Sequence, residues 1–486
     1  MLTLLLLLAC AAHHPIASPT PPCEAPAGPA LERRLDRRTD STLRQGNAVE
    51  LLVNGSASFQ RREQLGRAAD LILVKTFIFE DDEAGRGVAT LLAERAAAGA
   101  TVVLQYDIKG STRGAGELKE MADGASGSRW LAEKPLFTRL RQAGVIVVPT
   151  NVPRSERGME RWLSARERTR RDIAEVSLFS RLLGVRNLGH FDHEKYWITG
   201  VRQADGTVAL SAILGGLNIA SEYAYGGTPM VDPGTGRGGW RDTDVAVRGP
   251  AALDIYDRFC EVLARNLDHP LERFDPEAWR TPQPAAGDAE VRFVWNQPAF
   301  GNRRSVERLY RTLIQSTPAG APIHIESAYF TPSRRLSDPL RDALRRDVSL
   351  SVLTNSPESV DVPLVVDASR SAYARLARVS EHALLYEWIP VPAQGLNTLH
   401  AKTASFGSCG PVIIGSANLD GLSSERNSES VVMVRDPALR AAYDAATGVD
   451  FSPTCAQPVA DQVLRGTTLP VRVWRRFVYA AGWSWL

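Results

Sequence analysis

The alternation of apolar and polar positions divides the chain into short strands and helices that occur in the same order twice. In the segment 70–107, two runs rich in β-branched and aromatic residues flank a helix-forming stretch, which predicts the order strand, loop, helix, strand. The segment 321–356 predicts this order again, with strands at 323–330 and 348–354 and a helix near 337–346. Each segment is therefore expected to form a βαβ unit with parallel strands and a right-handed crossover.

The stretches that follow these units are also repeated. His193-Glu194-Lys195 precedes a predicted strand, turn and strand that end in Gly216-Leu217-Asn218. His400-Ala401-Lys402 precedes a similar pattern that ends in Ser416-Ala417-Asn418. The same chemical groups thus recur at corresponding points of the two repeats, which a chance match of one short motif would not produce.

The last repeated pieces complete an internal duplication. Aligning the segment 241–257 with 426–444 places Asp244 opposite Glu429. We expect an α/β fold in which two similar halves, with mixed and mostly parallel sheets flanked by helices, pack pseudo-symmetrically around one active site. The expected boundaries are 45–265 for the first half, 266–289 for a Pro-rich linker and 290–450 for the second half.

The first 30 residues belong to neither half. The run Leu2–Ala9 is too short to span a bilayer and is typical of the apolar region of an export signal. It is followed directly by Cys10, and the junction resembles a bacterial lipoprotein signal, so we expect lipidation at Cys10. Residues 13–30 are rich in Pro and Ala and predict a disordered tether. An ordinary cleaved signal or a disordered tail is the alternative.

The C-terminal extension 451–486 ends in a segment rich in aromatic residues. Residues 471–486 combine Trp, Tyr and Phe with arginines, a composition that suits the bilayer interface. A terminal segment packed on the protein core would have a similar composition. With a lipid on Cys10, this segment would provide a second anchor. We therefore expect the membrane surface as a partner and the periplasmic side of the bacterial cell envelope as the location.

Composition narrows the class of protein. Hydrophobic residues make up 44% of the chain and charged residues 23%, as in soluble globular proteins. The net charge of +2 gives no indication of nucleic acid as a partner. The 5 cysteines lack the spacing of a zinc site, and we expect neither a metal nor another cofactor. Lysine is rare beside arginine, which suggests that the lysines of the repeated motif are chemically required.

The repeated groups suit phosphodiester chemistry. On a strand, residues i and i+2 point to the same face, so each histidine shares a face with the lysine two residues later. A neutral imidazole can attack phosphorus, and a second one can act as general acid and then as general base. Lysine and asparagine can hold the phosphate oxygens where charge grows in the transition state. We expect Asp244 and Glu429 each to orient one histidine.

The duplicated motif resembles the signature of the phospholipase D superfamily, which is HxK, four residues, Asp, and then G-[GS]-x-N. The resemblance covers roughly residues 45–450 and is strongest to bacterial cardiolipin synthases, in particular to their C-type branch. It implies a phosphatidyltransferase with a phosphatidyl-histidine intermediate, with His193 and His400 as nucleophile and general acid. It also implies phosphatidylglycerol, and in addition phosphatidylethanolamine, as substrates. Gly216, Ser416, Lys195, Lys402, Asn218 and Asn418 all match the motif.

Two positions depart from that signature. The motif Asp would fall at Gly200 and Gly407, so an altered or inactive enzyme has to be considered. The alternatives to transfer are hydrolysis of phospholipid to phosphatidic acid, a nuclease of the same superfamily, and a lipid-binding protein without activity. Because every other motif residue is present twice, we favour an active enzyme.

Overall fold

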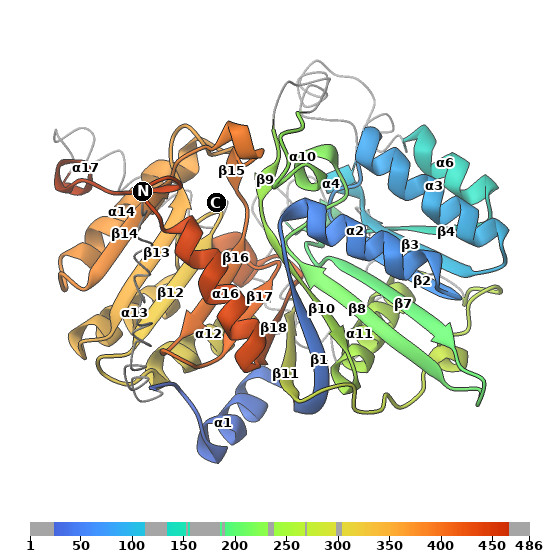
Figure 1. Cartoon of the computed structure of the whole chain (residues 1–486), viewed down its shortest axis with the longest axis horizontal. Coiled ribbons are helices and arrows are strands. Elements are labelled where there is room, and N and C mark those ends of the chain that lie inside the picture. The colour runs from blue at the N-terminus through green and yellow to red at the C-terminus, as the bar shows by residue number, and fades with distance from the viewer. Residues whose placement is uncertain are drawn as a thin grey trace, which may run out of the picture.

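The computed structural model describes residues 24–111, 134–151, 154–155, 185–186, 190–231, 238–267, 270–297 and 304–465. These residues form two α/β halves that lie side by side (Figure 1). A single 15-stranded sheet runs through both, in the order β19-β14-β13-β12-β16-β17-β18-β11-β1-β10-β8-β7-β2-β3-β4. The expectation of an α/β fold with two similar halves is confirmed.

The first half begins with β1 and ends with a long helix. Its sheet strands are β1 (Leu43–Val53), β2 (Leu71–Thr76), β3 (Thr101–Asp107), β4 (Ile146–Thr150), β7 (Tyr196–Arg202), β8 (Val208–Gly215) and β10 (Thr243–Arg248). Its helices are α2 (Asn54–Arg67), α3 (Glu83–Ala97), α4 (Ile108–Ser111), α6 (Pro135–Gln142), α10 (Ser221–Ala224) and α11 (Pro250–Asn266). The short strands β5 (Arg154–Ser155) and β6 (Val185–Arg186) form a separate pair.

The second half repeats this order of elements. Its sheet strands are β11 (Ala289–Asn296), β12 (Pro322–Ser327), β13 (Ser349–Asn355), β14 (Ala383–Trp388), β16 (Lys402–Phe406), β17 (Val412–Gly415), β18 (Glu429–Arg435) and β19 (Ala456–Pro458). Its helices are α12 (Ser305–Ser316), α13 (Arg334–Arg345), α14 (Leu364–Ala377), α15 (Gly421–Glu425), α16 (Pro437–Asp450) and α17 (Asp461–Arg465). Helix α1 (Pro29–Thr39) precedes β1 and packs on α12.

The βαβ units form as predicted, but the sheet is not mostly parallel. β2, β3 and β4 are parallel neighbours, and so are β12, β13 and β14. The remaining neighbours in the described sheet are antiparallel, so that part of the prediction was wrong. Parallel strands need a crossover helix, whereas β7–β8 and β16–β17 are connected by short turns that return the chain antiparallel.

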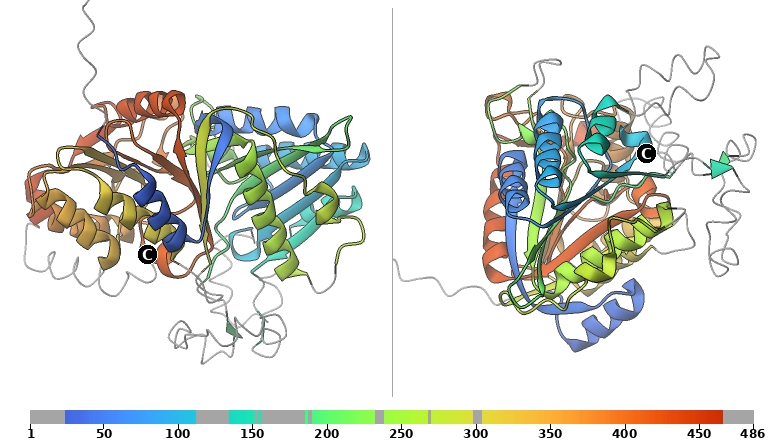
Figure 2. Two further views of the ribbon diagram at one scale, coloured as in Figure 1. Left: turned by 90° about the horizontal axis from the view of Figure 1, so that it is seen from below. Right: turned by 90° about the vertical axis from the view of Figure 1, so that its right-hand side faces the viewer.

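Local sequence accounts for where several of these elements begin. Helix α3 begins at Glu83, because the Asp82 side chain caps it by accepting a hydrogen bond from the Gly85 N–H. Asp436 caps α16 in the same way through the Leu439 N–H. Every residue of β2 is buried, as expected for a strand covered by helices on both faces. Figure 2 shows helices on both faces of the sheet in each half.

The two halves share one sheet and one core at their junction. β1 pairs with β10 of the first half, where Leu51 faces Val245, and with β11 of the second half, where Leu43 faces Arg292. Helices α11 and α16 both contact β1. One buried cluster contains side chains from each half, including Val245 and Val432. Because the junction is packed as a core, it holds residues of both halves in fixed positions around the site.

Several predictions concern the ends of the chain. Cys10, most of the predicted tether and residues 466–486 lie outside the described residues. Within the described part, β19 of the C-terminal extension pairs with β14, and no helix there is long and apolar enough to cross a membrane. Cys409 is disulfide-bonded, whereas Cys260 and Cys455 are free.

Candidate active site

Each HxK motif lies where one half meets a strand of the other half. The backbone N–H of His193 donates to the carbonyl of Ser428 (2.9 Å), and the N–H of His400 donates to the carbonyl of Arg241 (2.7 Å). The short strands β9 (Trp240–Arg241) and β15 (Thr398–Leu399) pair in parallel across the junction, next to α10 (Figure 1). Each histidine is thus positioned by the half that does not contain it.

A buried carboxylate from the opposite half binds each imidazole. His193 Nδ1 lies 2.9 Å and 3.0 Å from the two carboxylate oxygens of Glu429. His400 Nδ1 lies 2.6 Å from Asp242 Oδ2. Because a carboxylate accepts hydrogen bonds, each Nδ1 carries the proton and each Nε2 keeps its lone pair. Burial lowers the pKa of both histidines, which favours the neutral imidazole.

The prediction that Asp244 orients a histidine was wrong. Asp244 Oδ2 instead accepts hydrogen bonds from Ser58 Oγ (2.6 Å) and Arg62 Nη2 (2.7 Å) inside the first half. In the sheet, Asp244 faces Gly215, whereas Val431 faces Gly415. The counterpart of Glu429 is therefore Asp242, two residues before the one that the alignment selected.

The sequence did contain a signal for the correct register. Arg248-Gly249-Pro250 and Arg435-Asp436-Pro437 occupy the same point of the two halves, where β10 and β18 lead into α11 and α16. Counting back from these tripeptides pairs Asp242 with Glu429. The alignment anchored on Arg241 and Arg426 missed this because the two segments differ in length by two residues.

The G-[GS]-x-N motif differs between the halves for a geometric reason. Ser416 Oγ donates to Glu429 (2.5 Å) and accepts from the Ser430 N–H (3.0 Å). In the first half the shorter Asp242 itself accepts the corresponding N–H, that of Thr243 (2.7 Å). A Cβ atom at Gly216 would lie 2.1 Å from Asp242 Oδ1. Glycine there leaves room for the carboxylate that holds His400.

The two motif lysines are buried beside the histidines. Lys195 Nζ donates to the carbonyl of His193 (2.8 Å), and Lys402 Nζ donates to that of His400. Burial lowers the pKa of Lys195 to about 7 and that of Lys402 to about 8. Both positive charges also lower the pKa of each histidine, after the larger effect of burial. The four groups therefore interact across the junction as one site.

The motif asparagines complete this set. Asn218 is buried, and its Oδ1 accepts the backbone N–H of Ile78 (3.0 Å). Its Nδ2 is buried without a hydrogen-bond partner among the described residues, and so is Oδ1 of Asn418. Buried amide groups are normally paired, so the free Nδ2 of Asn218 suits an oxygen of a ligand, whereas the free Oδ1 of Asn418 suits a hydroxyl or N–H group of a ligand.

Aromatic rings fix the faces of both imidazoles, a feature that the sequence did not reveal. Phe77 lies edge-on to His193 with ring centroids 5.1 Å apart. Tyr223 and Trp240 lie 5.1 Å and 5.0 Å from His400. None of these rings belongs to the motifs, because they follow β2 or lie between the repeated segments. They restrict each imidazole to one orientation over its carboxylate.

Gly200 and Gly407, where the motif Asp was expected, lie away from the imidazoles. Each is seven residues after its histidine, which corresponds to roughly 20 Å along an extended strand. Gly200 pairs with Leu71 at the far end of β7. Gly407 has φ +80°, and a Cβ there would lie 2.1 Å from the carbonyl oxygen of Glu24. These glycines satisfy local backbone and packing constraints outside the site.

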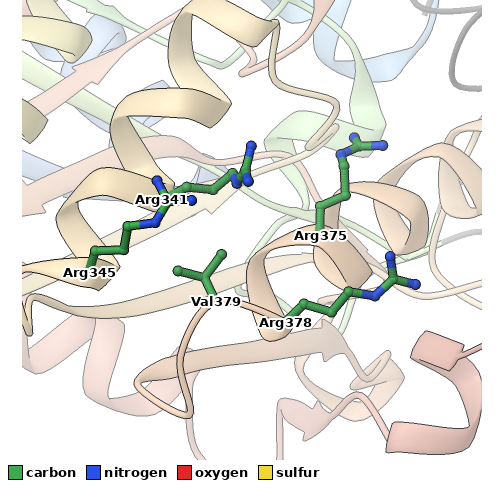
Figure 3. Close-up of a pocket in the computed structure, with 5 residues that line it drawn as sticks. All are labelled: Arg341, Arg345, Arg375, Arg378 and Val379. Carbon is green, nitrogen blue, oxygen red and sulfur yellow. The ribbon is translucent and has the colours of Figure 1, made fainter.

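A separate arginine-lined pocket does not contain any of these groups. Arg341, Arg345, Arg375, Arg378 and Val379 surround a cavity of about 390 Å³ where α13 and α14 end (Figure 3). The two arginines of α13 each lie near an aspartate one turn earlier in the same helix. The helices run away from the histidines, so this pocket is not the candidate active site.

Comparison with known proteins gives a consistent family. Residues 310–447 match the family model described as cardiolipin synthase, PLD-like domain. The chain is 27% identical over 400 residues to cardiolipin synthase B of Salmonella typhimurium, covering 81% of this chain and 78% of the relative. It is 28% identical over 421 residues to cardiolipin synthase A of Pseudomonas aeruginosa, covering 86% and 70%.

Among solved structures, phosphatidylserine synthase of Haemophilus influenzae has a similar fold. The TM-score is 0.59 with 13% identity, and the match covers 94% of this chain and 100% of that structure. At this identity the similarity concerns the fold alone.

Proposed function

We propose that this chain is a cardiolipin synthase-like enzyme of the phospholipase D superfamily, and that it transfers a phosphatidyl group between phospholipids through a covalent phosphohistidine. One observation carries the proposal. Two imidazoles, each with Nδ1 bound to a buried carboxylate, share a site with two lysines. This arrangement supplies two reactive Nε2 atoms and positive charge for a phosphodiester.

In the first step, Nε2 of one histidine attacks phosphorus. A P–N bond forms, and the carboxylate on Nδ1 stabilises the positive charge that develops on the ring. The P–O bond to the head group breaks at the same time. The second histidine, whose pKa rises when the anionic phosphodiester binds beside it, gives its Nε2 proton to the departing oxygen. The phosphatidyl group is now held on the enzyme and the head-group alcohol is free.

The second step reverses these roles with a new alcohol. The second histidine, now neutral, takes the proton from the hydroxyl of an acceptor lipid. The oxygen attacks phosphorus, the P–N bond breaks, and the first histidine returns to its neutral form. With phosphatidylglycerol as acceptor the product is cardiolipin. Water in place of the alcohol would give phosphatidic acid by the same step.

Lysine and asparagine stabilise the phosphate oxygens through both steps. Lys195 and Lys402 are held beside the histidines by their bonds to the histidine carbonyls, and so reach the same phosphate. Buried cations of this kind act strongly on charge in the transition state because little water screens them. The unpaired Nδ2 of Asn218 adds a neutral donor.

We further propose phosphatidylglycerol, and phosphatidylethanolamine as an additional donor, as substrates at the membrane of the bacterial cell envelope. Attachment through a lipidated Cys10 and through residues 471–486 agrees with this location. The composition of both segments supports it.

Product analysis tests the proposal directly. Purified protein is incubated with labelled phosphatidylglycerol vesicles, with and without phosphatidylethanolamine, and the lipids are separated by thin-layer chromatography. We expect cardiolipin with the wild type and none with His193→Ala or His400→Ala. Phosphatidic acid without cardiolipin would identify a lipase with the same chemistry. Unchanged lipids would contradict the proposed activity.

A further inference from the structure

The catalytic groups are too deeply placed to act on a lipid that remains flat in a membrane. The side chains of His193 and His400 are 12% and 8% exposed. Their rings are further covered by Phe77, Tyr223 and Trp240. A phosphodiester with two acyl chains must leave the plane of the head groups to reach them. The protein surface next to the histidines therefore has to meet the bilayer.

Large apolar side chains are exposed in both halves. In the described residues, the exposed large apolar side chains are Met230 (47%), Val231 (52%), Val362 (38%), Leu364 (52%), Leu384 (45%) and Val449 (57%). Single exposed apolar residues are common and need no explanation. Here four occur as two close pairs, one in each half. We call these four residues the apolar rim.

The first pair, Met230 and Val231, is connected to the surroundings of His400 by backbone contacts near β9. Val231 forms a bridge with Gly238, and the Asn397 N–H donates to the carbonyl of Gly239 (2.8 Å). The next residue is Trp240, whose ring packs on His400. The segment that carries this pair thus borders the imidazole from the side of the first half.

The second pair follows a segment of the other half that contacts the residue before His400. It follows β13, whose last residue Asn355 binds the backbone of Leu399 at both N–H (3.0 Å) and carbonyl (2.7 Å), directly before His400. Between Asn355 and Leu364, the Asp361 carboxylate accepts the hydroxyl of Tyr329 (2.7 Å). Tyr329 is next to Phe330, which bridges to the residue after Asn418.

From this placement we propose that the apolar rim inserts into the phospholipid surface and seats the entrance of the active site on the membrane. The inference rests on the proposed function, because a water-soluble substrate would not require it. Both pairs are linked through the backbone to the surroundings of His400, one from each half, so burying both would turn this side of the site towards the head groups. Apolar side chains of this size partition favourably into the region between head groups and acyl chains.

The chain offers a matched control for this proposal. Leu384 is 45% exposed, close to the value for Leu364, but it lies near the start of β14. β13 and β14 are parallel, with Leu350 opposite Ala383 and Asn355 opposite Trp388. Leu384 therefore lies at the end of these strands that is remote from His400. Leu384→Ser removes a similar apolar surface without touching the rim.

Vesicle binding of the full chain measures the effect. Met230→Ser/Val231→Ser and Val362→Ser/Leu364→Ser are compared with wild type and Leu384→Ser in flotation with phosphatidylglycerol vesicles. We expect each rim variant to bind about ten-fold more weakly and Leu384→Ser to stay within about two-fold of wild type. Rim variants that float like wild type, or an equal loss in Leu384→Ser, would overturn the proposal. So would wild-type protein that does not bind the vesicles.

A second readout separates this proposal from the proposed function. Turnover is measured on phosphatidylglycerol vesicles and on bis(p-nitrophenyl) phosphate, a water-soluble diester. We expect the ratio of the two rates to fall about ten-fold in the rim variants, because only vesicle lipid requires docking. An unchanged ratio with weaker flotation would show that the rim does not seat the active site. If wild type turns over neither substrate, the proposed function fails, while the flotation result still decides whether the rim binds membranes.

Discussion

The two aspartates on either side of Thr243, Asp242 and Asp244, should have different roles, one in activity and one in stability. Two matched variants can distinguish these roles. Asp242 holds His400, whereas Asp244 is bound to Arg62 and Ser58. The substitutions Asp242→Asn and Asp244→Asn each exchange one carboxylate oxygen for an NH₂ group with little change in shape. We expect the first to remove activity with the fold intact and the second to lower stability with the chemistry intact.

The hydrogen bonds of Asp242 determine how much activity the substitution Asp242→Asn should remove. Oδ1 accepts the Thr243 N–H (2.7 Å) and Oδ2 accepts His400 Nδ1 (2.6 Å). In Asp242→Asn the remaining oxygen has to face the Thr243 N–H, so the NH₂ group faces His400. The imidazole must then place its proton on Nε2, where it can neither attack phosphorus nor accept a proton. We expect kcat to fall about 10³- to 10⁴-fold, or about 4–5.5 kcal/mol of barrier.

Asp244 lies in a different environment, so its substitution should lower the stability of the fold and not the activity. Its Oδ2 lies 2.7 Å from Arg62 Nη2, and both side chains are almost fully buried. Removing the negative charge leaves the guanidinium of Arg62 buried without its counter-ion. We expect a loss of about 3 kcal/mol in the free energy of unfolding and a kcat within about three-fold of wild type.

The assay combines turnover of labelled phosphatidylglycerol vesicles with denaturant unfolding followed by circular dichroism. Both variants are measured at one pH, and the far-ultraviolet spectrum of Asp242→Asn confirms that it is folded. If Asp244→Asn loses the activity and Asp242→Asn keeps most of it, the strand register and the argument from the tautomer are both wrong. Equal losses in both would show that the two carboxylates act together.

Three further predictions concern other parts of the molecule. Burial lowers the pKa of Lys195 to about 7 and that of Lys402 to about 8. Raising the pH through this range should therefore remove the charge of both lysines and reduce kcat/KM. A pH–rate profile that stays flat to about pH 9 would contradict this. Gly407→Asp would introduce the Asp of the superfamily signature. We expect it to lower the free energy of unfolding by about 1–3 kcal/mol, measured by thermal unfolding, without raising kcat/KM, because φ is +80° and Cβ would lie 2.1 Å from the Glu24 carbonyl oxygen. A ten-fold gain in kcat/KM would argue for a catalytic Asp at this position. Non-reducing peptide mapping by mass spectrometry should find Cys409 in a disulfide and Cys260 and Cys455 as free thiols. A free Cys409 thiol would contradict this.

The repeated motifs were the most informative part of the sequence. HxK and G-[GS]-x-N occur once in each half, and the structure brings both copies together at the junction. The βαβ units were equally readable, because apolar periodicity and helix propensity are local properties. The parallel strands β2–β3 and β12–β13 follow from them. Antiparallel pairing across the rest of the sheet depends on which strands become neighbours, and local pattern does not contain that information.

The sequence alone also could not show whether Gly200 and Gly407 affect the active site. A motif position occupied by Gly200 and Gly407 suggested damage to the active site. The structure places both at the far ends of β7 and β16, where Gly407 adopts a conformation that favours glycine. Distance along a strand separates them from the imidazoles, so the motif spacing alone overstated their importance.

The sequence by itself determined which chemical groups are available and how they are spaced along the chain. It predicted that His193 and Lys195 form one pair and that His400 and Lys402 form a second one. Only the tertiary structure decided that each imidazole takes its carboxylate from the opposite half, and that the partner of His400 is Asp242. Contacts across the junction depend on strand register, and a shift of two residues keeps every side chain on the same face while exchanging one aspartate for the other. The apolar periodicity of the sequence is the same before and after such a shift. Packing against a neighbouring strand in a fixed position distinguishes the two registers.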